Sequence, residues 1–495
     1  MSYLRDLYRP SLGLLTDFYQ LTMAYGYWKA GVADRDAIFH LYFRKNPFDG
    51  GYTLAAGLDP AIDLVTGLGF DETDLAYLEG LRTEKDDPLF ESGFLDYLGA
   101  MKPSCDVEAI PEGRVVFAPE PLLRVTGPIA QCQLLETPLL NTVNYQTLIA
   151  TKAARIRQAC GNDPLIEFGL RRAQGVDGSL SATRAAYIGG ADATSNVLGG
   201  RLFDIPVRGT HAHSWVMFFD SEREAFLQFA RTMPDNCIFL VDTFDTLEGV
   251  RNAIEIGLGL QSQGHRLMGI RLDSGDLAYL SVEARRMLDK AGLNETSILA
   301  SNDLDEHLIT SLKQQDSAVG AWGVGTRLVT GFDQPSLGGI YKLSAVRDEE
   351  GQWSHRLKLS EQTLKVSYPG RLQVRRFTRD EKPIGDMIYE TEMGPEQPPM
   401  IVDPKDPIRS KAIPPMADAE ELLIPVVQQG QRVYEAPSLA TTRRRALVEL
   451  GAFHPTIRRL DNPHEYPVGL DPKLNRRRTE LILEARGKLR GDSVP

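Results

Sequence analysis

GIRLDSGD, at residues 269–276, contains the pattern that decides the fold of this chain: a short aliphatic run that stops abruptly in a polar cluster with a glycine. The pattern recurs between residues 166 and 331 at intervals of roughly 25 to 40 residues, the length of a strand, a helix and two loops. The other examples are IEFGLRR (166–172), IPVRGTHAHS (205–214), IFLVDTFDT (238–246), ILASNDLD (298–305) and GVGTRLVTG (323–331).

This repeat predicts a (β/α) barrel. Apolar runs without polar alternation are typical of strands that are buried on both faces, as in parallel sheets covered by helices. The polar clusters then all follow the carboxyl ends of their strands. In a (β/α) barrel these ends form one rim, and active sites are built on that rim. Six clusters that carry His, Asp, Arg, Asn and Thr are more than a scaffold needs, so we expect an enzyme.

The composition is that of a globular protein with more than one domain. The chain has 495 residues, which exceeds what one hydrophobic core usually supports. Its formal charge of −12 argues against nucleic acid or an anionic membrane as the main partner. The four cysteines form no CxxC and are expected to be reduced. Because no signal peptide or apolar run of about 18 residues is present, we expect a cytoplasmic protein.

The segment before the barrel predicts a mixture of helices and strands. Thr16 and Asp17 can cap a helix whose apolar residues recur at helical spacing. Strands are expected at 37–43 and within 114–127, and helices within 59–100.

After the barrel the hydrophobic period changes to two, which predicts two antiparallel hairpins. They are expected on either side of DEEGQ (348–352), and between residues 372–380 and 385–390. Residues 394–415 are rich in proline and are expected to be a linker, and a basic helical segment follows from about Ser438. The expected segments are 1–135 for the first part of an α/β domain, 136–340 for the barrel, and 341–495 to complete the α/β domain.

RLDSGD (271–276) is the more specific of two candidate ligand sites at strand ends. Asp273 can accept hydrogen bonds from a diol or hold a hydrated cation, and Arg271 offers a planar fork to a carboxylate or phosphate. An Arg–Asp pair that only closes a loop is the alternative. GVGT (323–326) leaves backbone amides open to a phosphate, although a plain βα connection has the same pattern.

Acidic residues at further strand ends suit a magnesium ion bound to a diphosphate. Asp242, Asn302 and Asp303 offer the oxygen ligands that Mg²⁺ prefers. Asp245 and Asp305, taken singly, are better explained as helix N-caps. Of these residues, Asp242 is taken as the candidate metal ligand.

FGLRR (168–172) and RGTHAHS (208–214) add an aromatic ring, guanidinium groups and two histidines. The first cluster suits a flat anionic ligand, although a surface salt bridge would explain one arginine equally. His211 and His213 can carry a proton or accept a phosphoryl group. They point to one side if the strand continues through them, and packed polar histidines are the alternative.

Several long stretches, in order, make the chain resemble the nicotinate phosphoribosyltransferase family. They are LLTDFYQLTMAYGYW (14–28), EFGLRRAQGVDGSLSATRAAYIGGADATSNVLGG (167–200), GTHAHS (209–214) and GVGTRLVTGFDQPSLGGIYKLS (323–344). The resemblance implies a type II phosphoribosyltransferase with an irregular (β/α) barrel and a second α/β domain built from N- and C-terminal segments. It also implies a homodimer with a shared active site.

The resemblance also implies an activity. Such enzymes convert nicotinate and 5-phosphoribosyl 1-diphosphate to nicotinate mononucleotide and diphosphate, in NAD biosynthesis, with Mg²⁺ as cofactor and ATP as co-substrate. ATP hydrolysis is coupled through a phosphohistidine, and the pattern G-T-x-A-H-S places it at His213, with His211 at the variable position.

Further roles follow from the resemblance. Thr210 would bind nicotinate, and Arg271 its carboxylate or the ribosyl donor. Tyr19 would stack on the pyridine ring from the partner subunit. Phe168 and Arg171 would sandwich that ring, Asp273 would contact ribose hydroxyls, and the 5′-phosphate would be held by Asn302, Asp303, Gly325 and Thr326.

Ser195 bears on which base is used. It stands where nicotinamide-specific relatives carry an aspartate, which would repel a carboxylate, so a neutral serine favours nicotinate. Asp192 lies three residues away and would change this interpretation if the alignment shifted.

Other functions remain open alternatives. A nicotinamide or quinolinate phosphoribosyltransferase is the nearest, although quinolinate needs more cationic residues. A ligand-binding relative without catalysis predicts decay of the site, yet its clusters are intact. A phosphosugar barrel without base transfer leaves FGLRR (168–172) and Tyr19 unexplained.

Overall fold

The computed structural model describes residues 11–359, 367–406 and 408–490. The chain divides into two compact units: unit 1 comprises Met1–Leu148 and Ser336–Pro495, and unit 2 comprises Ile149–Pro335. Unit 2 is thus inserted into the sequence of unit 1. The boundaries predicted after residues 135 and 340 lie near the ends of unit 2 and stay predictions.

Unit 2 contains six short strands that form one parallel sheet in the order β7-β6-β11-β10-β9-β8. Because the last strand along the chain, β11, pairs with the first, β6, the sheet curls round as a barrel does. Val207 extends it beyond β7 through an isolated bridge to Thr194. The strands are β6 (Leu165–Glu167), β7 (Ala193–Thr194), β8 (Ile238–Leu240), β9 (Gly269–Leu272), β10 (Ser297–Ala300) and β11 (Ala321–Val324).

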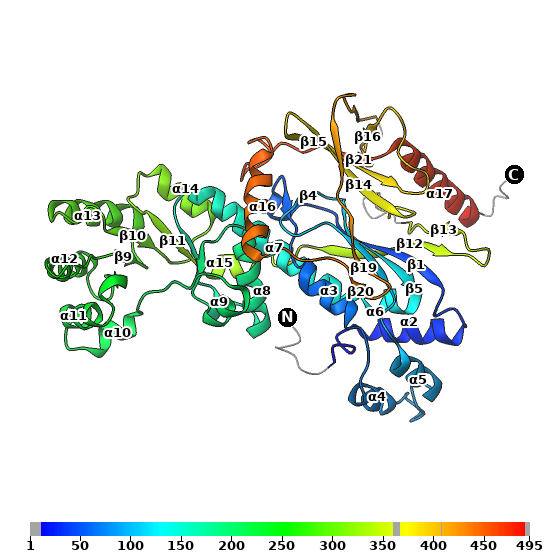
Figure 1. The fold of residues 1–495 in the computed structure, drawn as a ribbon, viewed down its shortest axis with the longest axis horizontal. Coiled ribbons are helices and arrows are strands. Elements are labelled where there is room, and N and C mark those ends of the chain that lie inside the picture. Colours follow the sequence, from blue (N-terminus) through cyan, green and yellow to red (C-terminus); the bar gives the residue numbers. More distant parts are fainter. Residues whose placement is uncertain (1–10, 360–366, 407, 491–495) are drawn as a thin grey trace. The chain divides into compact units, whose positions relative to one another are not determined.

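Helices alternate with these strands, and Figure 1 shows α12, α13 and α14 outside them. Asp245 and Asp305 cap α12 and α14, since their carboxylates accept from Glu248 N and Leu308 N, and both N-cap predictions are confirmed. The helical elements are α7 (Glu136–Cys160), η2 (Leu170–Arg172), α8 (Gly175–Ile188), α9 (Val197–Phe203), α10 (His213–Phe218), α11 (Glu222–Thr232), η3 (Pro234–Asn236), α12 (Thr246–Ser262), α13 (Leu277–Lys290), α14 (Glu306–Gln314) and α15 (Thr326–Val329).

One predicted strand of the barrel is wrong. Residues 205–214 form no strand beyond the single bridge at Val207. Pro206 cannot donate to a ladder and Gly209 weakens an extended segment, so the chain leaves the sheet here. β7 has only two residues and was not predicted.

Unit 1 contains a seven-stranded antiparallel sheet in the order β13-β12-β1-β5-β3-β19-β20. Strands from both ends of the sequence are interleaved, as the second domain was expected to be. Phe39 of β1 stacks on Tyr341 of β12, with ring centroids 4.8 Å apart. The strands are β1 (Asp36–Phe43), β3 (Asp106–Ala109), β5 (Pro121–Pro128), β12 (Gly339–Arg347), β13 (Trp353–His355), β19 (Ile424–Gln428) and β20 (Gln431–Arg432).

A second, mixed sheet of unit 1 has the order β17-β16-β21-β15-β14-β18. Its strands are β14 (Leu372–Arg379), β15 (Lys382–Glu390), β16 (Met400–Val402), β17 (Ser410–Ala412), β18 (Asp418–Glu421) and β21 (Val468–Leu470), and β2 (Thr53–Leu54) pairs separately with β4 (Val115–Val116). The helices are α2 (Phe18–Lys29), η1 (Pro47–Asp49), α3 (Leu58–Thr66), α4 (Glu72–Glu79), α5 (Ser92–Ala100), α6 (Ile129–Leu134), α16 (Leu439–Ala452) and α17 (Pro472–Arg490).

Most predictions for unit 1 are confirmed, but the predicted linker and the predicted cap of α2 are wrong. Both hairpins are present, as β12–β13 and β14–β15, although residue 360 lies outside the described residues. The expected linker at 394–415 instead contributes β16 and β17, which pair with each other. Asp17 stands at the N-cap of α2, but its carboxylate accepts from Thr137 Oγ1 at 2.7 Å and makes no cap bond.

The four cysteines are free and buried, as expected. No helix within the described ranges is both long enough and apolar enough to cross a membrane.

Candidate active site

Polar side chains at the carboxyl ends of neighbouring strands converge in unit 2. Asp242 follows β8, Asp273 follows β9, and Ser301 follows β10. The amide of Asp273 donates to Oδ2 of Asp242 at 2.9 Å, and the Ser301 hydroxyl donates to Oδ1 of Asp273. The three strand ends therefore form one connected polar surface.

Arg271 is the centre of this surface. Its Nη1 donates to Thr210 Oγ1 at 2.7 Å, and its Nε donates to Ser301 Oγ at 3.1 Å. Its Nη2 lies 3.5 Å from Oδ1 of Asp273, and its guanidinium carbon lies 5.9 Å from the centre of the Phe168 ring. Because the side chain is only 14% exposed, the guanidinium is held in one orientation beside an aromatic face.

The two carboxylate oxygens of Asp242 differ in their hydrogen bonds. Oδ2 accepts from the amide of Asp273 and from the Ser274 hydroxyl at 2.7 Å. Oδ1 is buried and accepts no hydrogen bond. A buried oxygen without a donor carries a desolvation cost, which a cation or a ligand hydroxyl would remove.

His213 begins α10 and lies between two strand ends. Its Nδ1 is 3.1 Å from Thr243 Oγ1, and its Nε2 is 3.8 Å from Oδ2 of Asp273. The side chain is 40% exposed, so a ligand can reach the ring. His213 and Arg271 therefore both lie beside Asp273, in the same site.

His211 lies in a different environment, because the strand has ended before the two histidines. It is 7% exposed, and its Nε2 accepts from the amide of Leu240 at 3.3 Å. Burial lowers the pKa of His211 to about 4, and the charge of Arg271 adds to this effect. The imidazole is therefore neutral near pH 7.

Phe168 explains why glycine occurs twice in GVGT (323–326). A Cβ at Gly323 would lie 2.5 Å from the Phe168 ring, and one at Gly325 would lie 3.0 Å from the Phe168 carbonyl oxygen. The two glycines therefore let β11 approach the residue that follows β6. This packing role was not predicted for them.

Glu167 fixes the loop that carries Phe168. It accepts from Thr194 Oγ1 at 2.6 Å, from Thr183 Oγ1 at 3.0 Å and from the amide of Gly169. Burial raises the pKa of Glu167, and these hydrogen bonds lower it part of the way. A carboxylate interrupting an apolar run was the sequence signal for this anchor.

Ser195 and Asp192 lie at opposite ends of β7. Ser195 is half-buried at the carboxyl end, and its amide donates to the Glu167 carbonyl at 2.9 Å. Asp192 precedes the strand and pairs with Arg157 at 2.8 Å. Of the two, only Ser195 follows β7 at the end of the strands where the site is built.

The remaining predicted residues are not joined to this hydrogen-bonded network. Asn302 and Asp303 follow β10 with φ of 99° and 41°, a backbone conformation that non-glycine residues rarely adopt and that clusters at ligand sites. Thr326 follows β11. Arg171 is exposed, and no hydrogen bond or ion pair joins it to another described residue.

Tyr19 lies on α2 of unit 1, and 49% of it is exposed. Burial raises its pKa, as do the carboxylates of Glu136 and Asp17.

Sequence reasoning missed two hydroxyl residues of the site and one cavity of unit 1. Thr243 and Ser301 were not singled out, although each adjoins a predicted residue. Unit 1 also contains a cavity of about 770 Å³, part of whose lining comes from the expected linker. Its lining carries the basic residues Arg44, Lys45, Lys405, Arg409 and Lys411 and the acidic residues Asp49, Asp403 and Glu465.

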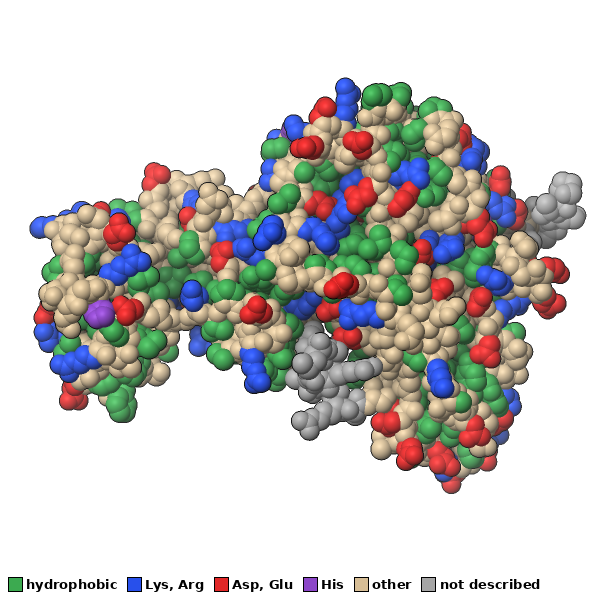
Figure 2. All heavy atoms as spheres, in the orientation of Figure 1, with side chains coloured by type: hydrophobic (Ala, Val, Ile, Leu, Met, Phe, Trp, Pro, Cys, Tyr) green, Lys and Arg blue, Asp and Glu red, His purple; other side chains and the backbone are tan. Residues whose placement is uncertain are grey.

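Figure 2 shows basic and acidic side chains interspersed over the visible face. Within the described ranges, no three His, Cys, Asp or Glu residues are grouped closely enough to hold a metal without other ligands.

Two solved structures share the fold of this chain. Human nicotinic acid phosphoribosyltransferase matches with a TM-score of 0.82 and 34% identity, over 94% of this chain and 99% of the human chain. The nicotinate-nucleotide pyrophosphorylase from Pyrococcus furiosus shares the fold, with a TM-score of 0.66 and 23% identity over 89% and 96% of the two chains. A (β/α) barrel inserted in the sequence of a second α/β domain is the fold of a type II phosphoribosyltransferase.

Sequence comparisons give the family. Family models for the N-terminal domain, the family itself and the C-terminal domain of nicotinate phosphoribosyltransferase (NAPRTase) match residues 14–144, 164–351 and 371–478. Nicotinate phosphoribosyltransferase of Bacillus subtilis (strain 168) is 40% identical over 486 residues, or 97% of each chain. That of Homo sapiens is 37% identical over 520 residues, or 93% of this chain and 95% of the human one. The chain belongs to the nicotinate phosphoribosyltransferase family and is a transferase.

Proposed function

We propose that this enzyme transfers phosphoribosyl from 5-phosphoribosyl 1-diphosphate to nicotinate, giving nicotinate mononucleotide and diphosphate for NAD biosynthesis. ATP hydrolysis is coupled to the reaction through a phosphorylated His213. The observation that carries the proposal is the convergence of His213, Asp242, Arg271 and Asp273 on one strand-end surface of a barrel whose relatives bear this name.

The nicotinate ring is proposed to lie against Phe168. Arg271, 5.9 Å from this ring and bonded to Thr210, can present its fork to the carboxylate. Ser195 supplies a neutral hydroxyl on the neighbouring strand end, which does not repel that carboxylate. Tyr19 and Arg171 are exposed and would complete the slot, Tyr19 from a second copy of the chain in a homodimer.

The ribosyl donor is proposed to lie along β9, β10 and β11. Asp273 would accept from the ribose hydroxyls. The 5′-phosphate would be bound by Asn302, Asp303, Gly325 and Thr326, which follow two adjacent strands. The left-handed backbone of Asn302 and Asp303 supports this role, because such strain persists where a ligand uses it.

The acidic residues fit a Mg²⁺ ion that arrives with the diphosphate. Mg²⁺ keeps several waters and is usually bound by one or two carboxylates together with substrate phosphates. Asp242 has a buried oxygen without a donor, and Asp273 lies beside it. When bound, the ion would neutralise charge that develops on the departing diphosphate.

The chain's own residues would then favour displacement at ribose C1. The carbon becomes cationic as diphosphate leaves, so a nearby carboxylate such as Asp273 stabilises it. Arg271 holds the nucleophilic base in line and limits its motion before reaction.

His213 would accept the γ-phosphoryl group of ATP, releasing ADP, and would later lose it to water as inorganic phosphate. A phosphohistidine adds about −1.5 to −2 charges beside the donor site. We propose that its contacts order the loop that binds the donor and bias the net reaction toward nicotinate mononucleotide. We expect the reaction in the cytoplasm, since free buried cysteines are typical of a reducing compartment.

The test is an assay with labelled nicotinate, nicotinamide or quinolinate, each with 5-phosphoribosyl 1-diphosphate and Mg²⁺, with and without ATP. The expected result is nicotinate mononucleotide as the main product and stimulation by ATP. Preference for nicotinamide would support the alternative enzyme, and no product from any base would support a binding protein. The variant His213→Ala should retain slow base transfer and lose ATP stimulation; full stimulation of this variant would refute the role of His213.

A further inference from the structure

The barrel of unit 2 has one interruption in its main-chain pairing. Every residue of unit 2 is described, and its strands pair in an unbroken series from Val207 through β7, β6, β11, β10 and β9 to β8. No main-chain hydrogen bond within unit 2 joins the segment after Val207 to β8. The amide of Leu240 in β8 therefore needs another acceptor.

The side chain of His211 provides that acceptor. Its Nε2 lies 3.3 Å from the Leu240 nitrogen. Since Nε2 accepts, the proton of the neutral ring is on Nδ1, which lies 3.4 Å from the carbonyl oxygen of Ala212. The imidazole thus stands in for a backbone carbonyl at the one place where the ring of strands is open.

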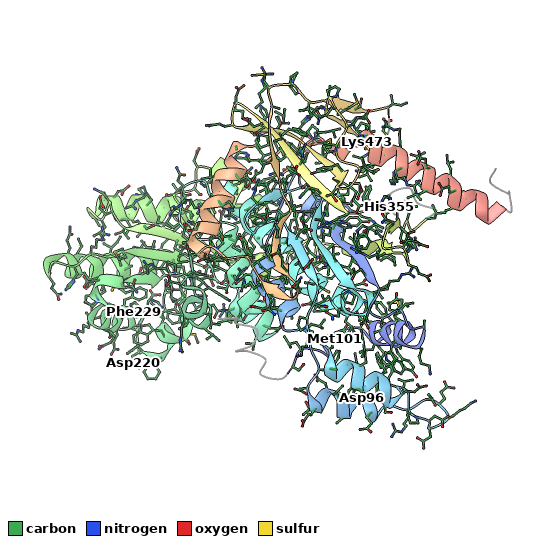
Figure 3. The ribbon with its side chains drawn as sticks, turned by 45° about the vertical axis from the view of Figure 1, so that its right-hand side comes forward. Asp96, Met101, Asp220, Phe229, His355 and Lys473 are labelled. Carbon is green, nitrogen blue, oxygen red and sulfur yellow. The ribbon has the colours of Figure 1, made fainter. Side chains whose placement is uncertain are left out.

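Aromatic packing holds this imidazole in place. Phe229 of α11 meets it edge-on at 5.0 Å between ring centroids, and Phe226 and Phe239 lie at 6.0 and 6.3 Å. Figure 3 marks Phe229, with Asp220 just before the start of α11. An edge-to-face ring and a satisfied hydrogen bond together fix the orientation of His211.

His211 precedes by two residues the histidine that faces the site. The loop from Gly209 to His213 is tied to the barrel by three side chains: Thr210 to Arg271 of β9, His211 to β8, and His213 to Thr243. Of these, only His211 is buried, and its ring bonds to the main chain of β8 instead of to a side chain of the site. It can therefore act on the chemistry only through the position of the loop.

We propose that His211 is a positioning residue, whose neutral imidazole ties the loop to β8 and so holds His213 against Thr243 and Asp273. Its functional consequence rests on the proposed phosphorylation of His213, whereas the tie to β8 is independent of that proposal.

Two substitutions separate the hydrogen bond from the packing. His211→Gln keeps an acceptor at about the same distance along the side chain, and His211→Met has similar volume without a strong acceptor. Hydrogen exchange of a peptide covering residues 238–241 measures whether the Leu240 amide is still hydrogen-bonded. The single-turnover rate of phosphorylation by labelled ATP, per folded enzyme, measures whether His213 is correctly placed. His265→Met, which removes a histidine bonded to Asp235 elsewhere in unit 2, is the matched control.

In His211→Met we expect exchange to rise and phosphorylation to slow, each by roughly tenfold or more, because an amide left without an acceptor is costly. His211→Gln should recover both to within about threefold, as expected when the acceptor is what matters. Normal exchange and phosphorylation in His211→Met, or equal losses in both variants, would overturn the inference. If the unmodified enzyme shows no phosphohistidine, the proposed function fails, and the exchange measurement alone decides whether His211 ties the loop.

Discussion

The burial of His211 predicts how acid destabilises unit 2. Its ordinary pKa is 6.5, and in the folded protein burial lowers the pKa to about 4. Between these pH values the unfolded chain binds a proton that the folded protein does not. The contribution of neutral His211 to stability is therefore complete above pH 6.5 and is lost as the pH falls toward 4.

The size of this effect follows from the pKa difference. Each pKa unit corresponds to about 1.4 kcal/mol, so the full difference is about 3 kcal/mol. At pH 5 about 2 kcal/mol of it would already be lost. For a unit of this size, that lowers Tm by roughly 4–8 °C.

The assay is thermal unfolding of the protein and of His211→Gln between pH 8 and pH 5. All other titrating groups are common to both, so their effects cancel in the difference between the two curves. We expect the Tm of the unmodified protein to fall by about 4–8 °C more than that of the variant. Parallel curves over the whole range would refute the argument that His211 is held neutral by burial.

Three further outcomes are expected. Arg271→Lys loses the fork that bonds Thr210 and Ser301, so kcat/KM for nicotinate, per folded enzyme, should fall roughly 30- to 150-fold. A loss smaller than tenfold would contradict this role. Gly323→Ala places a methyl group 2.5 Å from the Phe168 ring, so it should raise KM for nicotinate and destabilise the protein by about 1–3 kcal/mol, as measured by denaturant unfolding. Unchanged KM and stability would mean that the ring can move. Ser195→Asp should shift the ratio of kcat/KM from nicotinate toward nicotinamide by about tenfold or more, and an unchanged ratio would place Ser195 outside the base site.

Local signals made much of the barrel predictable. The apolar runs that precede Asp242 and Asp273 were long enough to indicate buried parallel strands. Asp245 and Asp305 were recognised as caps because a cap depends on only three or four neighbouring residues. The chemistry of the strand ends could then be proposed from residue type alone.

Other features depend on partners far along the chain. β16 and β17 were interpreted as a linker because of their prolines, yet β16 also pairs with β21, which lies more than sixty residues later. His211 could not be distinguished from His213, since its burial depends on a ring of α11 eighteen residues away. Thr243 and Ser301 were missed because hydroxyl residues are common in any turn.

The antiparallel sheet of unit 1 sets the order in which the two units can fold while the chain is being synthesised. β1 needs β12 as one of its two neighbours, yet roughly 300 residues separate them, which takes roughly 15–60 s at about 5–20 residues per second. Unit 2 finds all its strand partners within its own sequence and can complete its ladder first. During that interval one edge of β1 remains an open template for other chains, so we expect the nascent protein to be prone to wrong strand pairing until β12 has left the ribosome.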